Sequence, residues 1–312
     1  MARILTVGAA QLGPVPRADS RRQVVERLIG LLRQAHARGC RLVVFPEAAL
    51  TPFFPHWYMD DAAEINAFCE REMPGPDTRP LFEEARRLAM GFCLGYCELT
   101  ETDGRPRRFN SSILVSERGE IIGKYRKIHL PGHADYRPGQ KYQNLEKYYF
   151  DVGDLGFPVW RAFGGVLGMC ICYDRRWPES YRVLGLQGVE MVLLGYNTPL
   201  EGVSGPVEPA HLPMFHNWLS MQAGAYQNAT WVVGVAKAGL EEGVYQIGGS
   251  CIIAPTGEMV ARACTDGDEL IVAECDLDLG KRLRETVFNF TAHRRIEHYG
   301  LITQQTGAVP PD

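Results

Sequence analysis

Several features that would assign a function at once are missing from this sequence. No apolar run is long enough to cross a membrane, and the opening residues lead straight into a short strand-like run rather than a basic and then apolar leader. No internal repeat, low-complexity segment or shift of composition divides the chain. We therefore expect a single domain spanning residues 1–312, located in the cytoplasm and without a membrane partner.

An excess of positive charge is also missing. The 33 Lys and Arg residues are outnumbered by 37 Asp and Glu, which gives a formal net charge of −4, and no basic stripe stands out along the chain. A nucleic-acid partner is therefore not expected. Hydrophobic residues make up 46% of the sequence and charged residues 22%, values that are typical of a globular protein with a large core.

Cysteine is not scarce, but its spacing matches no small disulfide-bonded framework. The sequence holds nine cysteines: Cys40, Cys69, Cys93, Cys97, Cys170, Cys172, Cys251, Cys264 and Cys275. The odd number and the scatter through apolar segments predict reduced thiols, as in a cytoplasmic protein.

Metal and nucleotide motifs are absent as well. Two cysteine pairs, Cys170 with Cys172 and Cys93 with Cys97, lack a second ligand pair at zinc-site spacing. His129 and His133 have helical spacing but enclose Pro131 and Gly132, which makes a zinc-binding helix unfavourable. No glycine-rich phosphate-binding loop occurs either. We expect neither a metal nor a cofactor.

The pattern of apolar residues predicts a mixed α/β fold that opens with a βαβ unit. Residues 4–10 and 42–45 are short apolar runs of strand type, and residues 24–35 between them have helical spacing. Ser20 and Gln23 form a capping box in front of this helix, and Gly39 closes it. The second strand ends at Glu47, a carboxylate at the sheet edge where open α/β sheets place ligands.

Further along, strands and helices are predicted from the same periodicities. The expected strands are 91–97, 111–115, 121–125, 166–171, 189–194, 231–236, 251–254 and 270–273, and the expected helices are 61–71, 80–89, 179–186 and 211–227. Residues 101–108 are expected to be a charged turn, and residues 195–209 a Gly- and Pro-rich loop. Residues 131–158 form the longest irregular stretch, and a loop of this length inside a domain is more often functional than idle. Residues 282–300 are expected to be a helix and then an aromatic loop.

The stretch from Val166 to Glu179 is the strongest chemical signal. Its apolar strand stops at Cys172, and Pro178 then favours a helix start. A thiol held at a helix start can ionise below its free pKa and act as a nucleophile. Taken alone, this segment leaves open the alternative that Cys172 is one more buried small residue.

Three residues at the ends of strand-like runs can supply a base, an oxyanion stabiliser and a nucleophile. They are Glu47, Lys127 and Cys172. Each has a structural alternative, because Glu47 can cap the next element and Lys127 can belong to the solvated basic run 124–127. Only a fold can bring the three together.

With these residues in order, the chain resembles the nitrilase superfamily, the carbon–nitrogen hydrolases with a Glu-Lys-Cys triad. The resemblance is carried by Phe45–Glu47, Tyr125–Lys127 and Cys172–Glu179. It is closest to the N-carbamoyl-D-amino acid amidohydrolases, through the stretches 124–133, 153–158, 174–179, 195–199 and 220–224. The resemblance implies a four-layer α-β-β-α sandwich of two sheets. It also implies a homodimer or homotetramer, with an oligomerisation segment at about residues 277–312.

The resemblance further implies the reaction. Cys172 would attack the ureido carbonyl of an N-carbamoyl-D-amino acid, and Lys127 would stabilise the oxyanion. Glu47 would act as base and then as acid toward the leaving ammonia, supported by Glu146, which alone would be interpreted as part of a solvated pair with Lys147. The carbamic acid released after hydrolysis would lose carbon dioxide to give the D-amino acid.

A substrate pocket is implied by the same resemblance. Arg175 is predicted to hold the substrate carboxylate as a planar fork. Arg176 can instead form a structural pair with an acid such as Glu179. Asn197 and Thr198, at a strand end, are predicted to complete the amide and carboxylate pocket.

Four more residues belong to this predicted pocket. His129 and His216 match family histidines, and each is equally compatible with a structural role in the core. Asn144 and Tyr173 depart from the residues that N-carbamoyl-D-amino acid amidohydrolases commonly carry, His and Asn. An amidase or another carbamoyl-compound hydrolase of the same superfamily is therefore the alternative function.

Overall fold

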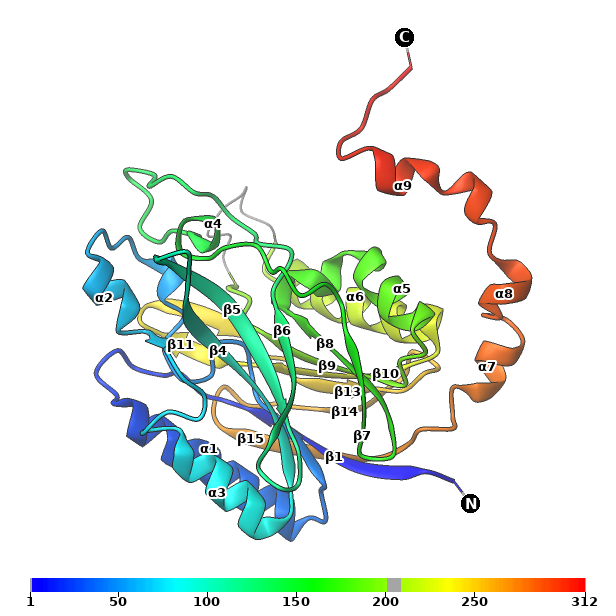
Figure 1. Cartoon of the computed structure of the whole chain (residues 1–312), viewed down its shortest axis with the longest axis horizontal. Coiled ribbons are helices and arrows are strands. Elements are labelled where there is room, and N and C mark those ends of the chain that lie inside the picture. Colours follow the sequence, from blue (N-terminus) through cyan, green and yellow to red (C-terminus); the bar gives the residue numbers. More distant parts are fainter. Residues whose placement is uncertain (1, 201–208, 312) are drawn as a thin grey trace.

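Two β-sheets packed face to face form the centre of the molecule (Figure 1). The computed structural model describes residues 2–200 and 209–311. Within these residues the first sheet has seven strands in the order β15-β1-β2-β4-β5-β6, with β3 beside β4. Its strands are β1 (Ile4–Gln11), β2 (Leu42–Val44), β3 (Cys69–Glu70), β4 (Gly91–Thr102), β5 (Arg105–Val115), β6 (Ile121–Arg126) and β15 (Glu269–Asp276).

The second sheet has six strands among the described residues, in the order β14-β13-β10-β9-β8-β7. They are β7 (Val159–Ala162), β8 (Gly165–Ile171), β9 (Met191–Tyr196), β10 (Trp231–Ala236), β13 (Cys251–Ile253) and β14 (Met259–Arg262). β8, β9 and β10 run parallel, so their carboxyl ends meet at one edge. A separate hairpin of β11 (Ala238–Glu241) and β12 (Val244–Ile247) follows β10.

Helices cover the outer face of each sheet. α1 (Arg21–Ala37) and α3 (Arg79–Leu88) lie on the first sheet, and α5 (Pro178–Leu186) and α6 (Leu212–Asn228) lie on the second (Figure 1). The predicted capping box of α1 is present, with Ser20 accepting from the Gln23 backbone. The four-layer α-β-β-α sandwich expected from the sequence is confirmed.

The two cores follow from the alternation of side chains along each strand. Leu42 and Val44 of β2 point between the sheets, whereas Val43 and Phe45 pack toward α1 and α3. Successive side chains of a strand point to opposite faces, so a short apolar run supplies both cores at once. This burial on both sides explains why β2 has no polar residue until the chain leaves the sheet.

Three sequence predictions are wrong in their boundaries. The expected charged turn at 101–108 is the end of a long hairpin, because β4 continues to Thr102 and β5 starts at Arg105. The expected helix at 61–71 ends early, as α2 (Ala62–Asn66) is followed by β3. In both places tertiary strand pairing overrides local propensity. The expected irregular stretch 131–158 contains a short helix, α4 (Glu146–Tyr149).

The remaining short elements lie in loops and near the C-terminus. They are η1 (Phe54–His56), η2 (Cys172–Arg176), α7 (Lys281–Glu285), α8 (Phe290–His293), η3 (Ile296–His298) and α9 (Gly300–Gln304). The C-terminal elements extend away from the sandwich in an arc (Figure 1). Of the predicted loop at 195–209, residues 201–208 lie outside the described residues.

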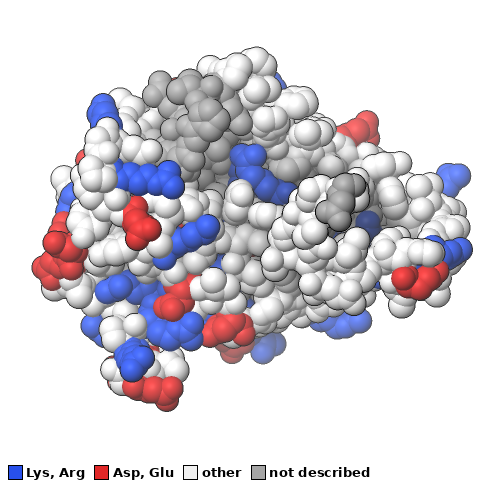
Figure 2. Space-filling model, turned by 90° about the horizontal axis from the view of Figure 1, so that it is seen from above, with Lys and Arg blue, Asp and Glu red and all other residues white. Residues whose placement is uncertain are grey.

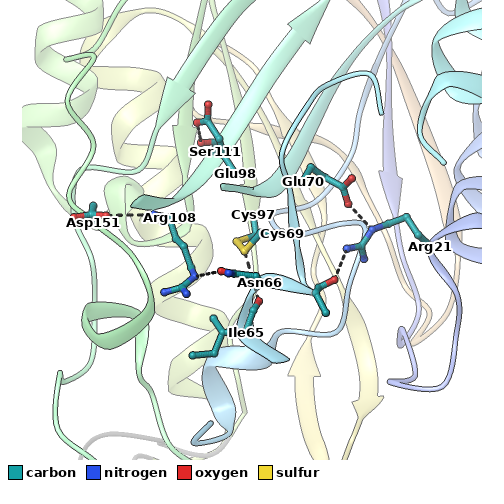
Figure 3. Close-up of a disulfide and its surroundings, with 11 residues drawn as sticks. Arg21, Ile65, Asn66, Cys69, Glu70, Cys97, Glu98, Arg108, Ser111 and Asp151 are labelled. Carbon is teal, nitrogen blue, oxygen red and sulfur yellow. Dashed lines mark hydrogen bonds and ion pairs between the residues drawn. A yellow bond between two sulfur atoms is a disulfide. The ribbon is translucent and has the colours of Figure 1, made fainter. Parts of the chain in front are cut away.

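A disulfide joins Cys69 of β3 to Cys97 of β4, which are direct partners in the parallel register (Figure 3). The prediction that all nine cysteines are reduced is therefore wrong for this pair. It failed because the two residues are 28 positions apart and meet only through strand pairing. The other seven cysteines are free.

The helices contain no candidate for a membrane span. Over the part of the chain that the structure describes, none is both long enough and apolar enough to cross a bilayer.

Candidate active site

The nucleophile candidate lies on a sharp elbow between β8 and α5. Cys172 has a φ of 47°, in the left-handed region that a non-glycine residue enters at a cost of about 1–2 kcal/mol. Asp174 holds the elbow, because its carboxylate accepts from the Ile171 backbone at 3.0 Å and from the Tyr125 hydroxyl at 2.7 Å. Local strain that neighbouring contacts hold in place is typical of functional sites.

The thiol of Cys172 is buried, with 6% of its residue surface exposed. Burial raises its pKa, and the charge of Glu47 adds to the rise, while the charges of Lys127 and Arg175 oppose it. Together these effects give a pKa of about 11. The predicted lowering of the pKa by a helix start is therefore wrong for the resting enzyme. Cys172 is the first residue of a five-residue 3₁₀ turn, η2 (Cys172–Arg176), rather than of a long helix, and desolvation dominates its pKa. The thiol needs a neighbouring base to react.

Lys127 brings the predicted carboxylates together. Its ammonium donates to Glu47 Oε1 at 2.7 Å and to Glu146 Oε2 at 2.6 Å, and all three side chains are buried. Burial alone would lower the pKa of Lys127, but the negative charges of Cys172, Glu146 and Glu47 raise it well above its usual range. Lys127 therefore stays positively charged at every working pH.

Glu47 is fixed from two further directions. The side-chain amide of Asn110, on β5, donates to Glu47 Oε1 at 2.8 Å. The backbone N–H of Asn197, just after β9, donates to Glu47 Oε2 at 2.9 Å, and its side-chain amide donates to the Glu47 carbonyl at 3.0 Å. Both sheets thus hold the same carboxylate.

Two glycines let the sheets approach Glu47 this closely. A Cβ on Gly95 of β4 would lie 2.7 Å from Glu47 Cα, and one on Gly195 of β9 would lie 2.4 Å from the Glu47 nitrogen. Neither space admits a side chain, so glycine is required at both positions. Ala48 then turns the chain with a φ of 45°.

Glu146 has a pKa near neutrality. Burial raises its pKa, the Lys127 ammonium opposes the rise, and the charge of Glu47 adds to it. The net result is a pKa of about 7. Sequence reasoning assigned Glu146 to an irregular loop, but it is the first residue of the short helix α4 (Figure 1). From there its carboxylate accepts from Lys127. A group with a pKa near neutrality can hold or release a proton during a reaction.

Asn197 connects the base to the thiol. Its backbone N–H binds Glu47, and its carbonyl accepts from the Cys172 Sγ at 3.3 Å. The backbone N–H and the carbonyl of Asn197 therefore bind the Glu47 carboxylate and the Cys172 sulfur, respectively, and hold the two groups near each other.

Arg175 is buried next to the thiol, with 2% of its surface exposed. Its Nη1 donates to the Cys172 carbonyl at 2.6 Å and lies 3.6 Å from Sγ, and its Nη2 donates to the Thr198 hydroxyl at 2.7 Å. Its Nε donates to Asn217 at 2.9 Å. Among the described residues, four of its five N–H groups thus reach protein acceptors, and an intact guanidinium fork is not open to a ligand.

The remaining predicted pocket residues lie at varied distances from this cluster. His129 Nδ1 donates to Asp174 Oδ1 at 2.8 Å, and the ring stacks on Trp177, which fits its structural alternative. Tyr173 meets the edge of Trp177 as well. Asn144 is half-buried and its backbone pairs with His133. Arg176 is exposed, and His216 is half-buried on α6.

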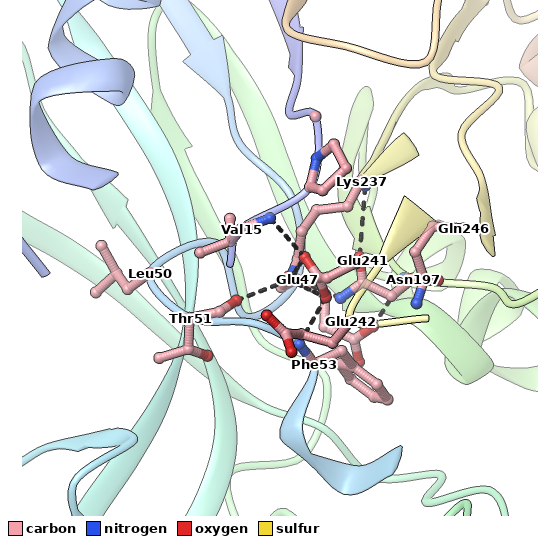
Figure 4. A network of polar contacts seen from close by, with 12 residues as sticks. Val15, Glu47, Leu50, Thr51, Phe53, Asn197, Lys237, Glu241, Glu242 and Gln246 are labelled. Carbon is pink, nitrogen blue, oxygen red and sulfur yellow. Dashed lines mark hydrogen bonds and ion pairs between the residues drawn. The ribbon is translucent and has the colours of Figure 1, made fainter. Parts of the chain in front are cut away.

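Sequence reasoning missed Asn110 and a second buried ion pair, Lys237 with Glu241 (Figure 4). An isolated amide before an apolar strand and a lysine directly after one were the available signals. Polar residues at strand ends are common, so neither signal stands out without the fold.

Lys and Arg side chains on the upper face of the molecule are spread out and interspersed with Asp and Glu (Figure 2). This mixed charge agrees with the absence of a basic stripe in the sequence. Within residues 2–200 and 209–311, no group of three or more His, Cys, Asp and Glu side chains gathers as a metal site.

The fold is that of known carbon–nitrogen hydrolases. The crystal structure of such an enzyme from Helicobacter pylori G27 superposes with a TM-score of 0.82, covering 97% of this chain and 99% of that one. At 23% sequence identity this likeness establishes the fold.

The sequence establishes the family. The profile of the carbon–nitrogen hydrolase family matches residues 6–285, so the chain belongs to this family and to the nitrilase superfamily. It is 31% identical over 297 residues to a nitrilase of Pyrococcus abyssi, covering 95% of this chain and 99% of that protein. It is 30% identical over 318 residues to an N-carbamoylputrescine amidase of Solanum lycopersicum, covering 99% and 98%.

Proposed function

We propose that this hydrolase converts N-carbamoyl-D-amino acids to D-amino acid, ammonia and carbon dioxide through a covalent thiol intermediate. The supporting observation is the buried Lys127 ammonium, which binds both Glu47 and Glu146 within electrostatic reach of the Cys172 thiol. This cluster combines a nucleophile, a base and a fixed positive charge.

In the proposed acylation step, Glu47 takes the thiol proton while Cys172 Sγ attacks the ureido carbonyl carbon. Negative charge develops on the carbonyl oxygen and is stabilised by Lys127. The tetrahedral intermediate collapses by breaking the bond to the terminal nitrogen, which leaves as ammonia with the proton from Glu47. A thiocarbamate on Cys172 remains.

In the proposed second step, Glu47 takes a proton from water, and the hydroxide attacks the thiocarbamate carbon. The carbon–sulfur bond breaks, the thiolate regains a proton, and a carbamic acid is released. The carbamic acid loses carbon dioxide to give the amino acid. Glu146 supports these steps because its pKa of about 7 lets it buffer the charge around Lys127.

The substrate carboxylate is proposed to bind at Arg175 and Thr198. Because most of the guanidinium donors are already engaged, the remaining Nη2 N–H and the Thr198 hydroxyl proton are the donors offered. Asn197 lines the amide side of the same pocket. Arg176, Asn144, Tyr173, His129 and His216 are proposed as its outer lining.

The second candidate is a hydrolase of another amide or carbamoyl compound. It is favoured by the likeness to an N-carbamoylputrescine amidase and by the engaged donors of Arg175. Ammonia release from paired N-carbamoyl-D- and L-amino acids, N-carbamoylputrescine, a simple amide and a nitrile separates the two. Turnover of the D-acids above the rest supports the proposal, and preference for a neutral or cationic substrate contradicts it.

We also propose that the chain assembles as a homodimer or homotetramer through the segment 277–312. A groove of about 520 Å³ lies between α5 and this segment, and Leu186, Val287 and Ile302, which line it, expose 49%, 58% and 57% of their surface. Light scattering on the full chain and on a chain ending at Leu279 tests this, since a monomeric full chain would contradict it.

A cytoplasmic location is also proposed, and it is supported by the seven free cysteines.

A further inference from the structure

A second buried lysine–glutamate pair lies beside the proposed active site. Lys237 Nζ donates to both carboxylate oxygens of Glu241 at 2.9 Å, and neither residue is more than 3% exposed (Figure 4). A buried pair of this kind rarely adds stability over an apolar pair of the same shape. Its position within the fold is therefore the feature to explain.

The pair ties together three chain segments that surround Glu47. Lys237 Nζ donates to the Thr51 carbonyl at 2.7 Å, and the Glu241 carboxylate accepts from the Phe53 backbone at 2.7 Å and from the Val15 backbone at 2.9 Å. Thr51 and Phe53 belong to the loop that carries Glu47 out of β2, whereas Lys237 follows β10 of the other sheet.

A second connection reaches Glu47 directly. The Lys237 backbone N–H donates to Asn197 Oδ1 at 3.4 Å, and the amide group of Asn197 in turn donates to the Glu47 carbonyl. Lys237 therefore contacts the loop after Glu47 and also the residue that holds Glu47 and the Cys172 thiol.

We propose that Lys237 and Glu241 are positioning residues that hold Glu47 in the geometry in which it can take the thiol proton. The inference rests on the proposed role of Glu47 as the base. The pair touches no reacting atom, and it acts by fixing the loop 48–53 and Asn197 between the two sheets.

The experiment measures alkylation of Cys172 by iodoacetamide, which needs no substrate. In Glu241→Gln and in Lys237→Met the rate at pH 7 should fall tenfold or more, since misplacement of a catalytic group by about 1 Å costs on the order of 10²-fold. The rates should approach that of the wild type only as the pH rises toward 11, where the thiol ionises without a base. The kcat for a carbamoyl substrate should fall similarly with KM little changed.

The double variant Lys237→Met with Glu241→Gln separates positioning from general stability. It leaves no buried unpaired charge, so its Tm should recover toward that of the wild type. Its alkylation rate should stay low, because Thr51 loses its donor. Recovery of the alkylation rate together with Tm would overturn the proposal.

A matched control is Glu98→Gln on β4. Glu98 is 6% exposed and accepts from Lys124, Arg126 and Ser111, and among the described residues none of these three side chains hydrogen-bonds Glu47. Its alkylation rate should match that of the wild type, and an equal fall would also overturn the proposal. A wild-type chain inactive on carbamoyl compounds but with slow alkylation in Glu241→Gln would refute the proposed function and leave this inference standing.

Discussion

The two buried lysines differ in how many negative groups surround them. Lys127 hydrogen-bonds both Glu47 and Glu146 and senses the Cys172 thiol, whereas Lys237 hydrogen-bonds one carboxylate, that of Glu241, and senses Glu47 more weakly. Burial works to lower the pKa of both ammonium groups. The surplus of negative charge nevertheless raises the pKa of Lys127, while that of Lys237 remains lowered.

This difference separates the proposed reactive cluster, which consists of Glu47, Lys127, Glu146 and Cys172, from the rigid pair of Lys237 and Glu241. Around Lys127 the acids outnumber the cation, so one proton has several possible sites. Burial, with a smaller contribution from the charge of Glu47, raises the pKa of Glu146 to about 7. Around Lys237 the charges balance, and backbone N–H groups of Phe53 and Val15 occupy the carboxylate. A surplus of charge supports proton transfer, and a balanced pair fixes geometry.

The largest effect is expected when each of the two buried lysines is replaced. Lys127→Met should lower kcat roughly 10³-fold, because it removes the proposed oxyanion donor and the partner of both carboxylates. Lys237→Met should lower kcat less and should cost about 3–5 kcal/mol of unfolding free energy, since it leaves Glu241 buried and unpaired. Steady-state kinetics and urea denaturation of both variants measure the two quantities. Equal losses of kcat would contradict the distinction.

A smaller effect is expected from crowding the reactive cluster without changing its charges. Gly195→Ala would place a Cβ 2.4 Å from the Glu47 nitrogen, so Glu47 must shift and kcat should fall on the order of 10²-fold. Gly30→Ala is the matched control, because nothing lies within 4 Å of its Cβ and α1 should gain roughly 0.5–1 kcal/mol. Unchanged kinetics in Gly195→Ala would show that Glu47 tolerates displacement.

The next prediction concerns the arginine between the cluster and the pocket. Arg175→Lys keeps the charge but cannot reach Asn217, the Cys172 carbonyl and Thr198 together. We expect kcat/KM for carbamoyl acids to fall ten- to a hundredfold, a loss of about 1.5–3 kcal/mol. A neutral amide should lose less. The same loss on both substrates would assign Arg175 to the elbow of Cys172 rather than to the substrate carboxylate.

The last prediction is the dependence of stability on pH that the Glu146 carboxylate should contribute. Burial raises the pKa of Glu146 from 4.5 to about 7, so between these values the folded state binds more protons than the unfolded state. The unfolding free energy should therefore fall as pH rises from 4.5 to 7, by an amount on the order of a few kcal/mol, and then level off. Denaturation of wild type and Glu146→Gln across this range tests the sign, since the variant should lack this component. An identical slope in both would contradict it.

The sequence was sufficient where the signal was local. Glu47 and Cys172 stand directly after apolar strands, and the structure places both at strand ends with Lys127 and Glu146 beside Glu47. The mixed α/β fold followed from periodicity, and the four-layer α-β-β-α arrangement followed from the family resemblance. The raised pKa of Cys172 could not be foreseen, because it depends on how deeply the thiol is buried.

Features that depend on pairing between distant strands were not predictable. Cys69 and Cys97 meet through the β3–β4 register, and Lys237 and Glu241 reach Glu47 through loops of the other sheet. In both cases the decisive contact is with a residue far away in the sequence. The charged residues 101–108 failed differently, because the turn is confined to Asp103 and Gly104 and the pairing of β4 with β5 keeps the residues on either side extended.

The wide separation of the site residues has a consequence for a chain still being synthesised. Glu47 contacts Lys127 across 80 positions and Asn197 across 150 positions. A nascent chain that has just added Cys172 lacks Asn197, and its thiol has no fixed base. The sulfur should therefore remain an ordinary, slowly reacting thiol until both sheets have closed. In the same way, local opening that separates Asn197 from Glu47 should lower the reactivity of the thiol before most of the helices and strands are lost.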